Sequence, residues 1–350
     1  MKIKGLRQVS PFVPGEQPQD QKLIKLNTNE NPYPPSPKVK KALKEFDVDQ
    51  LKYYSPVEQD ELRQAIADHL GVENDMIIIG SGSDEVLSMS FLAFFNNPQA
   101  ILFPDLTYGF YKTLANLYGI PYHEIPLEDD FTLSNQGYLQ ENGGIVLVNP
   151  NAPTGLGKPL SEIKAILKAN PQVMVIVDEA YINFGGQTAL PLLKDYPNLF
   201  IIRTFSKDAS LAGLRVGYGI GHPQIIDLMK AIKDSVNPYN LDSIAEVLAK
   251  ATVEDWTYYE KTIAAICQTR EWFKQELEKM DYTVIPSFTN FLLVKPQGIA
   301  ASDLYQHLKD HHIYTRYFAD AIRIKDYLRI SIGSQSDMET VVKVLQALKK

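Results

Sequence analysis

The chain has little cysteine and no long apolar run among its 350 residues. Its single cysteine, Cys267, excludes an internal disulfide and a zinc site built from cysteines, and it fits a reducing compartment. No stretch approaches the ~20 apolar residues that a membrane-spanning helix needs. The first residues also lack the apolar segment of a secretory signal peptide. We therefore expect a cytoplasmic protein that does not associate with membranes.

Positive charge is also scarce. The chain has 35 lysines and arginines against 42 acidic residues, a net charge of −7. Because no basic run with interleaved aromatics occurs, a nucleic-acid surface is disfavoured. His311 and His312 are adjacent and have no apparent third ligand, so we expect no metal site. The composition, 45% hydrophobic and 22% charged, is typical of a globular protein.

Short apolar runs alternate with amphipathic segments through the first 250 residues, which predicts a mainly parallel sheet between helices. Ligands of such folds bind where loops meet at the carboxyl ends of the strands. The expected strands are Met76–Ile79, Ala100–Phe103, Ile145–Val148, Val173–Val177, Leu199–Ile202 and Val216–Ile220. The expected helices include Glu85–Phe95, Tyr108–Tyr118 and Ser161–Ala169.

The pattern changes near residue 250 and predicts a second, smaller α+β domain. Long helical segments there mix with short strands, at Tyr282–Ile285, Asn290–Val294 and Leu328–Ile332. The first 35 residues are rich in proline and asparagine, which favours an extended arm. The predicted division is an arm over 1–35, a large cofactor-binding domain over 36–250 and a small domain over 251–350.

The most informative segment is 203–217, where Ser206 and Lys207 follow the apolar strand Leu199–Ile202. A lysine at the end of a buried strand can be partly desolvated, which frees its amine to attack a carbonyl. Ser206 and Arg215 supply a hydroxyl and a fixed cation, the groups that hold a phosphate. An amine beside a phosphate clamp suggests pyridoxal phosphate. Taken alone, the pattern favours a surface lysine at position 207 and an Arg215 that pairs with an arbitrary carboxylate, so the other parts of a site must be found elsewhere in the chain.

Two more segments supply parts of such a site. Gly80 to Glu85 lies between a strand and a helix, where glycines and free N–H groups bind phosphate. A Rossmann fingerprint would need a third glycine at Glu85, and Ser83 or Asp84 is alternatively only a helix cap. Asp178 ends an apolar strand and can keep a pyridine nitrogen protonated, with Tyr181 donating to the same ring. A metal-binding pair or a plain cap are the alternatives for Asp178.

The remaining candidates are individually weaker. The asparagines in 149–155 follow a strand, where they usually mark a turn, although an amide there could also bond a cofactor oxygen. Tyr108 either stacks on a planar ring of a ligand or is ordinary packing. Arg329 lies within an apolar strand and needs a partner, either a substrate anion or a structural carboxylate. Arg316 is a second candidate for an anion, or an exposed side chain.

Taken together, these segments resemble the fold type I aminotransferases, which depend on pyridoxal 5′-phosphate. The resemblance runs nearly end to end and is closest to the branch that acts on histidinol phosphate. The matching strings are 26–32, 82–85, 107–109, 149–155, 178–181, 203–207, 211–217 and 328–333.

The resemblance implies a role for each candidate residue. Lys207 would link covalently to the cofactor and shuttle the substrate proton, Asp178 would pair with the ring nitrogen, and Tyr181 would donate to the ring oxygen. Arg329 would bind the carboxylate of glutamate or 2-oxoglutarate, and Arg316 the substrate phosphate. By the same resemblance, the cofactor phosphate would be held by Gly82, Ser83, Asp84, Ser206 and Arg215. Tyr108 would stack on the cofactor ring. Phe12 and Asn31 would make further contacts with the substrate. Tyr54 would reach the cofactor of the partner subunit, which implies a homodimer with shared active sites.

Two departures from the family pattern concern the site. Ala152 stands where relatives often have asparagine, so Asn151 is expected to take over that hydrogen bond, or Tyr181 to serve alone. Phe12 stands where relatives often carry a tyrosine that holds substrate phosphate. One lost hydrogen bond to a charged group costs about 1.5–3 kcal/mol, so the preference for phosphate would be softened.

The expected reaction converts imidazole-acetol phosphate and L-glutamate to L-histidinol phosphate and 2-oxoglutarate, by ping-pong kinetics in histidine biosynthesis. An aromatic-amino-acid aminotransferase and a threonine-phosphate decarboxylase are the alternatives within the same scaffold. A binding or regulatory module without turnover is the alternative from another class. No DNA-binding segment is visible in the sequence, and every ionisable group that the chemistry needs is present.

Overall fold

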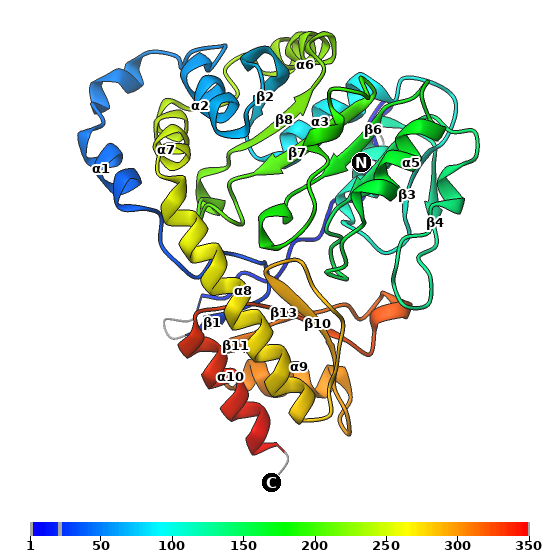
Figure 1. Ribbon diagram of the computed structural model, residues 1–350, viewed down its shortest axis with the longest axis vertical. Coiled ribbons are helices and arrows are strands. Elements are labelled where there is room, and N and C mark those ends of the chain that lie inside the picture. Colours follow the sequence, from blue (N-terminus) through cyan, green and yellow to red (C-terminus); the bar gives the residue numbers. More distant parts are fainter. Residues whose placement is uncertain (1–2, 20–22, 349–350) are drawn as a thin grey trace.

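A seven-stranded sheet forms the centre of the upper lobe in Figure 1. The computed structural model describes residues 3–19 and 23–348. Six of the strands run parallel, and only β8 is antiparallel to its neighbours β7 and β2. The predicted α/β class with a mainly parallel sheet is therefore confirmed. In spatial order the strands are β2 (Ile77–Gly80), β8 (Gly217–Gly221), β7 (Leu199–Thr204), β6 (Val175–Asp178), β5 (Ile145–Val148), β3 (Ile101–Pro104) and β4 (Tyr122–Ile125).

Helices cover both faces of this sheet, and most of its strands contribute side chains to two separate cores. Along β5, Ile145 and Leu147 pack in one hydrophobic cluster, while Val146 and Val148 pack in the other. This alternation follows from the two-residue period of a strand, and burial on both sides explains the continuous apolar runs. The helices of this lobe are α1 (Pro37–Glu45), α2 (Asp60–Leu70), α3 (Ser83–Phe94), α4 (Phe110–Tyr118), α5 (Leu160–Ala169), α6 (Pro223–Val236) and α7 (Ser243–Val253).

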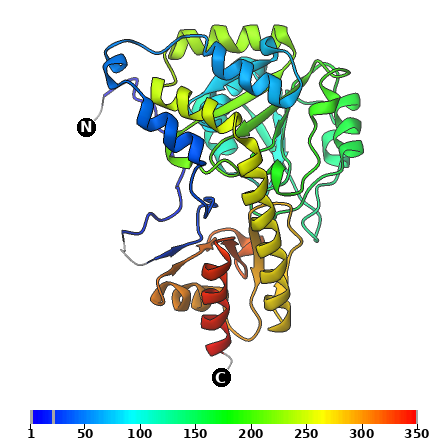
Figure 2. The same cartoon turned by 60° about the vertical axis from the view of Figure 1, so that its left-hand side comes forward.

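The lower lobe contains a four-stranded antiparallel sheet (Figures 1 and 2). The long helix α8 (Trp256–Lys279) extends from the upper lobe into this one. In spatial order the strands are β12 (Arg316–Tyr317), β13 (Leu328–Ser331), β10 (Phe291–Lys295) and β9 (Thr283–Val284), with helices α9 (Ala301–Asp310) and α10 (Gln335–Ala347). The 3₁₀ helices of the described chain are η1 (Val48–Lys52), η2 (Asn74–Met76), η3 (Gln136–Tyr138), η4 (Ile182–Phe184), η5 (Leu190–Leu192), η6 (Ala212–Leu214) and η7 (Ile322–Ile324).

Part of the N-terminal segment is core structure and not an extended arm. Strand β1 (Ile24–Lys25) pairs in parallel with β11 (Ile313–Tyr314) of the lower lobe. Leu26 is only 3% exposed, and its carbonyl accepts a hydrogen bond from the Ser331 amide at 2.9 Å. The division of the chain at residues 35 and 250 stays a prediction, but residues 24–29 pack with the lower lobe.

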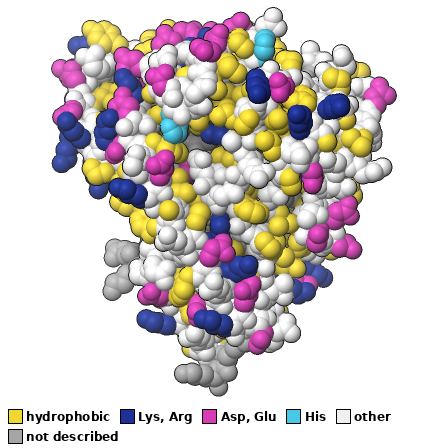
Figure 3. All heavy atoms as spheres, in the orientation of Figure 1, with side chains coloured by type: hydrophobic (Ala, Val, Ile, Leu, Met, Phe, Trp, Pro, Cys, Tyr) yellow, Lys and Arg dark blue, Asp and Glu magenta, His cyan; other side chains and the backbone are white. Residues whose placement is uncertain are grey.

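The surface carries mixed charge. On the face drawn in Figure 3, acidic and basic side chains are interspersed, and neither sign gathers over a whole lobe. Within the described ranges, no helix is both long enough and apolar enough to span a bilayer.

Candidate active site

A cavity of about 800 Å³ lies at the carboxyl ends of the parallel strands, where the sequence predicted a ligand site. Three parts of the chain line it: the N-terminal segment between Phe12 and Glu30, the loops of the upper sheet, and the strands of the lower lobe. Of the predicted site residues, those that line the cavity are Phe12, Ser83, Asp84, Tyr108, Asp178, Tyr181, Ser206, Lys207, Arg215, Arg316 and Arg329.

Lys207 follows β7 and places its amine in this cavity. The Thr204 hydroxyl accepts a hydrogen bond from the Ser206 amide at 3.1 Å, which turns the chain sharply at the end of the strand. The Lys207 Nζ donates to the Thr28 carbonyl at 2.9 Å and lies 6.0 Å from the centre of the Tyr181 ring. No carboxylate in the described ranges forms an ion pair with it, so the amine is held by a neutral acceptor that a ligand can replace.

Asp178 ends β6 and is only 4% exposed. The Tyr111 hydroxyl donates to its Oδ2 at 2.7 Å and the Ala180 amide to its Oδ1 at 3.0 Å. Burial raises the pKa of Asp178 to about 6, although both hydrogen bonds act in the opposite direction. Because no basic side chain in the described ranges pairs with it, a cationic group inside the cavity would stabilise the carboxylate.

The first turn of α3 and Arg215 form an anion-binding end of the cavity. Ser83 and Asp84 are the first residues of this twelve-residue helix, whose N-terminus favours negative charge. The Arg215 guanidinium donates to Asp84 Oδ2 at 3.1 Å and to the Ser206 hydroxyl at 3.4 Å. Gly82 has φ of 81°, and a Cβ there would lie 2.4 Å from Arg215 Nη2. Glycine at this position therefore lets the guanidinium approach the helix terminus.

Arg316 and Arg329 form a second anion-binding end. They are direct partners across β12 and β13, and like charges in that position destabilise a sheet. The Arg329 Nε is buried without a hydrogen-bond partner, and burial lowers the pKa of this guanidinium. Neither arginine forms an ion pair with a carboxylate anywhere in residues 3–19 or 23–348. An anionic ligand between them would relieve both the repulsion and the unpaired donor.

Two aromatic side chains cover the cavity from the side of α4. Phe12, from the N-terminal segment, packs edge-to-face against Tyr108 with ring centroids 5.5 Å apart. The Tyr108 hydroxyl donates to Asp84 Oδ1 at 3.1 Å, and burial raises the pKa of this phenol. Tyr108 therefore stays protonated and fixed as a flat wall beside the first turn of α3.

The structure places four predicted residues outside the cavity wall: Gly82, described above, and Asn151, Asn31 and Tyr54. The Asn151 amide donates to the Leu106 carbonyl and the Thr154 hydroxyl, both at 3.0 Å, so its donors are used within the loops. The Asn31 amide donates to the Asp208 carbonyl at 3.0 Å. Tyr54 is 80% exposed and stacks on Tyr239. Their roles in cofactor or substrate binding stay predictions.

The sequence reasoning missed Asn29, which is almost fully buried and is part of the cavity wall. Its amide donates to the Tyr181 hydroxyl at 3.0 Å, across 152 positions of the chain. Asn29 has φ of 59°, a left-handed conformation that asparagine tolerates better than most residues. The only signal in the sequence was its place in the string 26–32, which gives no partner.

Arg323 was also missed, and it links the two lobes at the rim of the cavity. Its guanidinium pairs with Asp105 at 3.1 Å and donates to the carbonyls of Leu127 at 3.0 Å and Glu128 at 2.6 Å. Arg323 belongs to η7, whose Ile324 lines the cavity. These contacts hold the lower-lobe wall of the site against the upper lobe.

We expect Arg323→Ala to raise the KM for the amino donor that the resemblance implies by about tenfold, with little change in kcat, since a loosened wall weakens binding more than chemistry. Steady-state kinetics of the purified protein measure both constants. Lys325→Ala, an exposed change near the same turn, is the matched control and should alter neither. An unchanged KM in Arg323→Ala would show that the link between the lobes does not shape the site.

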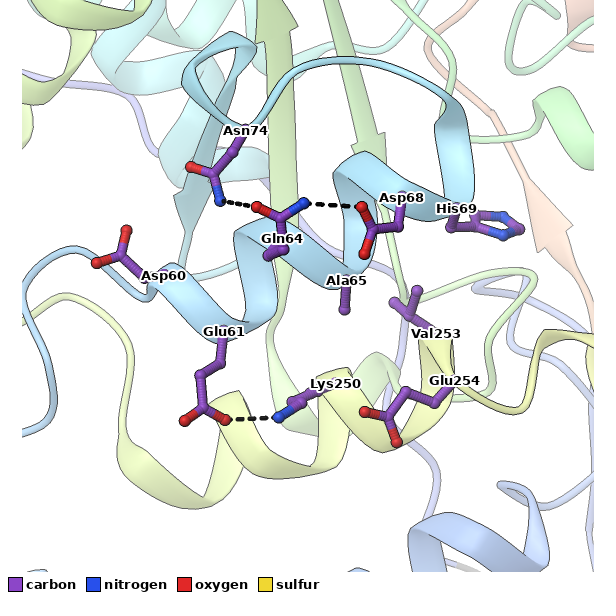
Figure 4. A pocket seen from close by; sticks show the side chains of 10 residues that line it. All are labelled: Asp60, Glu61, Gln64, Ala65, Asp68, His69, Asn74, Lys250, Val253 and Glu254. Carbon is purple, nitrogen blue, oxygen red and sulfur yellow. Dashed lines mark hydrogen bonds and ion pairs between the residues drawn. The ribbon is translucent and has the colours of Figure 1, made fainter.

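A second cavity, of about 880 Å³, lies between α2 and α7 and has a different character (Figure 4). Its only ammonium group, on Lys250, is already paired with Glu61 at 2.5 Å. No group of three or more potential metal ligands occurs among the described residues. The residues that line it are Asp60, Glu61, Gln64, Ala65, Asp68, His69, Asn74, Lys250, Val253 and Glu254. Of these two cavities, the first combines an amine that is not in an ion pair within the described ranges, that of Lys207, with two anion-binding ends.

A family model described as "Aminotransferase class I and II" matches residues 21–348. The chain belongs to the class I and II aminotransferases. The predicted family is therefore confirmed, together with its activity class, and this aminotransferase keeps Lys207, Asp178 and Arg215 around a single cavity.

Curated relatives of this aminotransferase cover nearly the whole chain. It is 47% identical over 346 residues to "Histidinol-phosphate aminotransferase" of Lactococcus lactis subsp. cremoris (strain SK11), covering 99% of this chain and 97% of the relative. It is 44% identical over 336 residues to the protein of the same name from Clostridium botulinum (strain Langeland / NCTC 10281 / Type F), covering 96% and 95%.

Solved structures agree with this. The histidinol-phosphate aminotransferase from Sinorhizobium meliloti, in complex with pyridoxal-5′-phosphate, superposes with a TM-score of 0.84 at 26% identity. The match covers 93% of this chain and 91% of that one. The fold class predicted from the sequence is confirmed by this similarity.

Proposed function

We propose that this aminotransferase transfers an amino group between L-histidinol phosphate and 2-oxoglutarate, the reverse of imidazole-acetol phosphate with L-glutamate, in the biosynthesis of L-histidine. The observation that carries the proposal is the pair of facing arginines, Arg316 and Arg329, in the cavity that holds Lys207. Each substrate brings an anion for this pair, a phosphate in one half-reaction and a carboxylate in the other. The names of the relatives support the same substrate.

Pyridoxal 5′-phosphate fits the residues at the other end of the cavity. The Asp178 carboxylate has no cationic partner among the described residues, and burial raises its pKa to about 6. A protonated ring nitrogen would supply the missing charge. The first turn of α3, Ser206 and Arg215 would hold the phosphate, and Tyr108 would lie against the ring. When bound, this cofactor stabilises the negative charge that develops at the substrate Cα.

The chain itself supplies the proton transfer and the orientation. The Lys207 amine would hold the cofactor covalently in the resting enzyme and, once released by the substrate amine, would move the proton at the substrate Cα. The Tyr181 hydroxyl would donate a hydrogen bond to the ring oxygen, and Arg329 would bind the carboxylate of glutamate or 2-oxoglutarate. Since one cavity serves both half-reactions, the first product leaves before the second substrate enters.

The choice between substrates is tested by kcat/KM. We expect histidinol phosphate to exceed phenylalanine, because phenylalanine offers no phosphate to Arg316. Both donors are assayed with 2-oxoglutarate at saturation. A clear preference for phenylalanine would favour an aromatic-amino-acid aminotransferase. Release of carbon dioxide without any need for a 2-oxoacid would favour a threonine-phosphate decarboxylase.

Phe12→Tyr should raise kcat/KM for histidinol phosphate by about tenfold and leave the value for phenylalanine nearly unchanged. Phe12 lines the cavity, and a hydroxyl there would add one hydrogen bond to a charged phosphate, worth about 1.5–3 kcal/mol. The control is Phe110→Tyr, which adds a hydroxyl to a neighbouring ring that packs on Phe12. An equal gain in kcat/KM for both amino donors would show that the side chain at position 12 does not recognise the phosphate.

We also propose a cytoplasmic homodimer in which Tyr54 reaches the cofactor phosphate of the partner subunit. Tyr54 is exposed and does not line the cavity of its own chain. Apolar side chains in the same and a neighbouring segment also face solvent in the single chain, as a surface for a partner subunit would require. These side chains are Val48, Leu51, Tyr53, Val236 and Tyr239. Sedimentation equilibrium of the wild type and of Tyr54→Ala tests the assembly.

A further inference from the structure

Asn29 donates a hydrogen bond to Tyr181, and the proposed chemistry gives Asn29 no role. Asn29 is 1% exposed, follows β1 in the chain and lines the cavity next to Tyr181. Its backbone carbonyl accepts from the Asn290 amide at 2.9 Å, and its backbone amide donates to the Ser331 hydroxyl at 3.0 Å. The segment is therefore fixed on both sides, and the side chain has no freedom to turn away from Tyr181.

The directions of these hydrogen bonds can be worked out. The Ser331 hydroxyl accepts from the Asn29 backbone amide, so it uses its own proton for Asn29 Oδ1, at 2.8 Å. The Asn29 amide nitrogen must then face the Tyr181 hydroxyl, to which it donates at 3.0 Å. Because the Tyr181 oxygen already accepts this bond, its proton points elsewhere. Tyr181 lines the cavity, and that proton is available there.

The loop after β5, where the sequence predicted an asparagine contact to the cofactor, offers the cavity no side-chain donor of this kind. The loop after β5 presents Ala152 and Pro153, neither of which has a polar side chain. The nearby Asn151 amide is already used by the Leu106 carbonyl and the Thr154 hydroxyl. Tyr181 therefore has to act without help from this loop, and its strength as a donor depends on what contacts its hydroxyl.

We infer that Asn29 is a positioning residue that, held by Ser331, directs the Tyr181 proton into the cavity and strengthens its donation to the bound cofactor. A hydroxyl that accepts a hydrogen bond becomes a better donor, because such chains polarise one another. Ser331 lies two residues from Arg329 on β13, so the same strand anchors this contact and the substrate carboxylate. The inference rests on the proposed function, since it assumes pyridoxal phosphate beside Tyr181.

The test is a spectrophotometric pH titration of the holoenzyme, without substrate. A hydrogen bond from Tyr181 lowers the affinity of the cofactor's ring oxygen for the proton that it shares with the lysine nitrogen. A weaker hydrogen bond should therefore raise the pH at which the yellow form loses this proton. For Asn29→Gly, which keeps the left-handed backbone and removes the amide, we expect a rise of about one pH unit. The dissociation constant for the cofactor should rise about 2- to 10-fold.

Asn29→Asp separates positioning from packing. It keeps the shape but replaces the donor with an acceptor, which would turn the Tyr181 proton away from the cavity. The pH midpoint should then rise further than in Asn29→Gly. Asn142→Ala is the control, since Asn142 is a buried asparagine that bonds Asn170 at 2.8 Å far from the cavity. It should lower thermal stability and leave the midpoint unchanged.

The outcomes are distinguishable. A wild type that shows no lysine-linked absorption would overturn the proposed function and this inference together. A wild type that binds the cofactor, with Asn29→Gly and Asn29→Asp titrating as the wild type does, would overturn only the role of Asn29. An equal shift of the pH midpoint in the Asn142→Ala control would also overturn the role of Asn29, because the midpoint would then follow a general loss of stability.

Discussion

Replacing Lys207 with alanine should abolish the yellow absorption of the bound cofactor and lower turnover by at least about 10³-fold. The Lys207 amine is the only one among the described residues that lines the cavity, so no neighbour can take over its covalent link or its proton transfer. The spectrum of the purified variant, with steady-state rates for histidinol phosphate, measures both losses. Added methylamine should restore part of the rate, because a small amine can enter the space left by the side chain.

Lys274→Ala is a suitable control, since its amine lies on α8 near Glu278 at 3.8 Å and far from the cavity. It should match the wild type in spectrum and rate. Normal activity in Lys207→Ala would refute the assignment of this lysine. A normal yellow spectrum in Lys207→Ala, even with activity lost, would show that another amine holds the cofactor and would refute the covalent role of Lys207.

Asp178→Asn should lower kcat by about 10²- to 10³-fold and at the same time stabilise the cofactor-free protein at neutral pH. The loss follows from removing a preorganised charge beside the proposed ring nitrogen. The gain follows from burial, which raises the pKa of Asp178 from 3.8 to about 6. The folded state binds this proton more tightly than the unfolded state, so the cost of burying the ionised group is absent below pH 4. It grows between pH 4 and pH 6 and reaches up to about 3 kcal/mol above that range.

Chemical denaturation of the cofactor-free protein at pH 7.5 and pH 4.5 measures this gain, which should be larger at pH 7.5. Asp208→Asn is the matched control. Burial raises the pKa of Asp208 to about 6 as well, and its side chain bonds Asn183 away from the cavity wall. It should show a similar gain in stability and keep turnover within a few-fold. If Asp178→Asn turned over at the wild-type rate, the proposed partner of the ring nitrogen would be wrong.

Most of the upper lobe could be predicted because its strands are buried on both faces. Ile145–Val148 and Leu199–Ile202 are continuous apolar runs, and the structure places strands on both. Strand β4 was missed because it lies at the sheet edge, where its His123 and Glu124 face solvent and break the apolar pattern. The antiparallel direction of β8 could not be predicted either, since a strand's own residues do not encode its orientation.

The candidate site could be predicted where a residue follows a buried strand. Lys207 and Asp178 both do so, and the ends of parallel strands meet at one edge. The sequence could not tell the roles of Asn151 and Asn29 apart. These roles depend on the direction of each side chain and on partners far along the chain. The sequence favoured Asn151 because it lies beside a strand end, whereas the contact of Asn29 depends on how β1 packs against the lower lobe.

The pairing of β1 with β11 has a consequence for synthesis on the ribosome. Residues 24–25 leave the ribosome long before their partner strand at 313–314 has been made. The upper lobe can assemble while the segment before it still waits for a partner, because domains tend to fold as units during translation. The cavity would therefore be completed only when the end of the chain folds back onto its beginning. A nascent chain arrested before residue 313 should leave the first 30 residues open to protease.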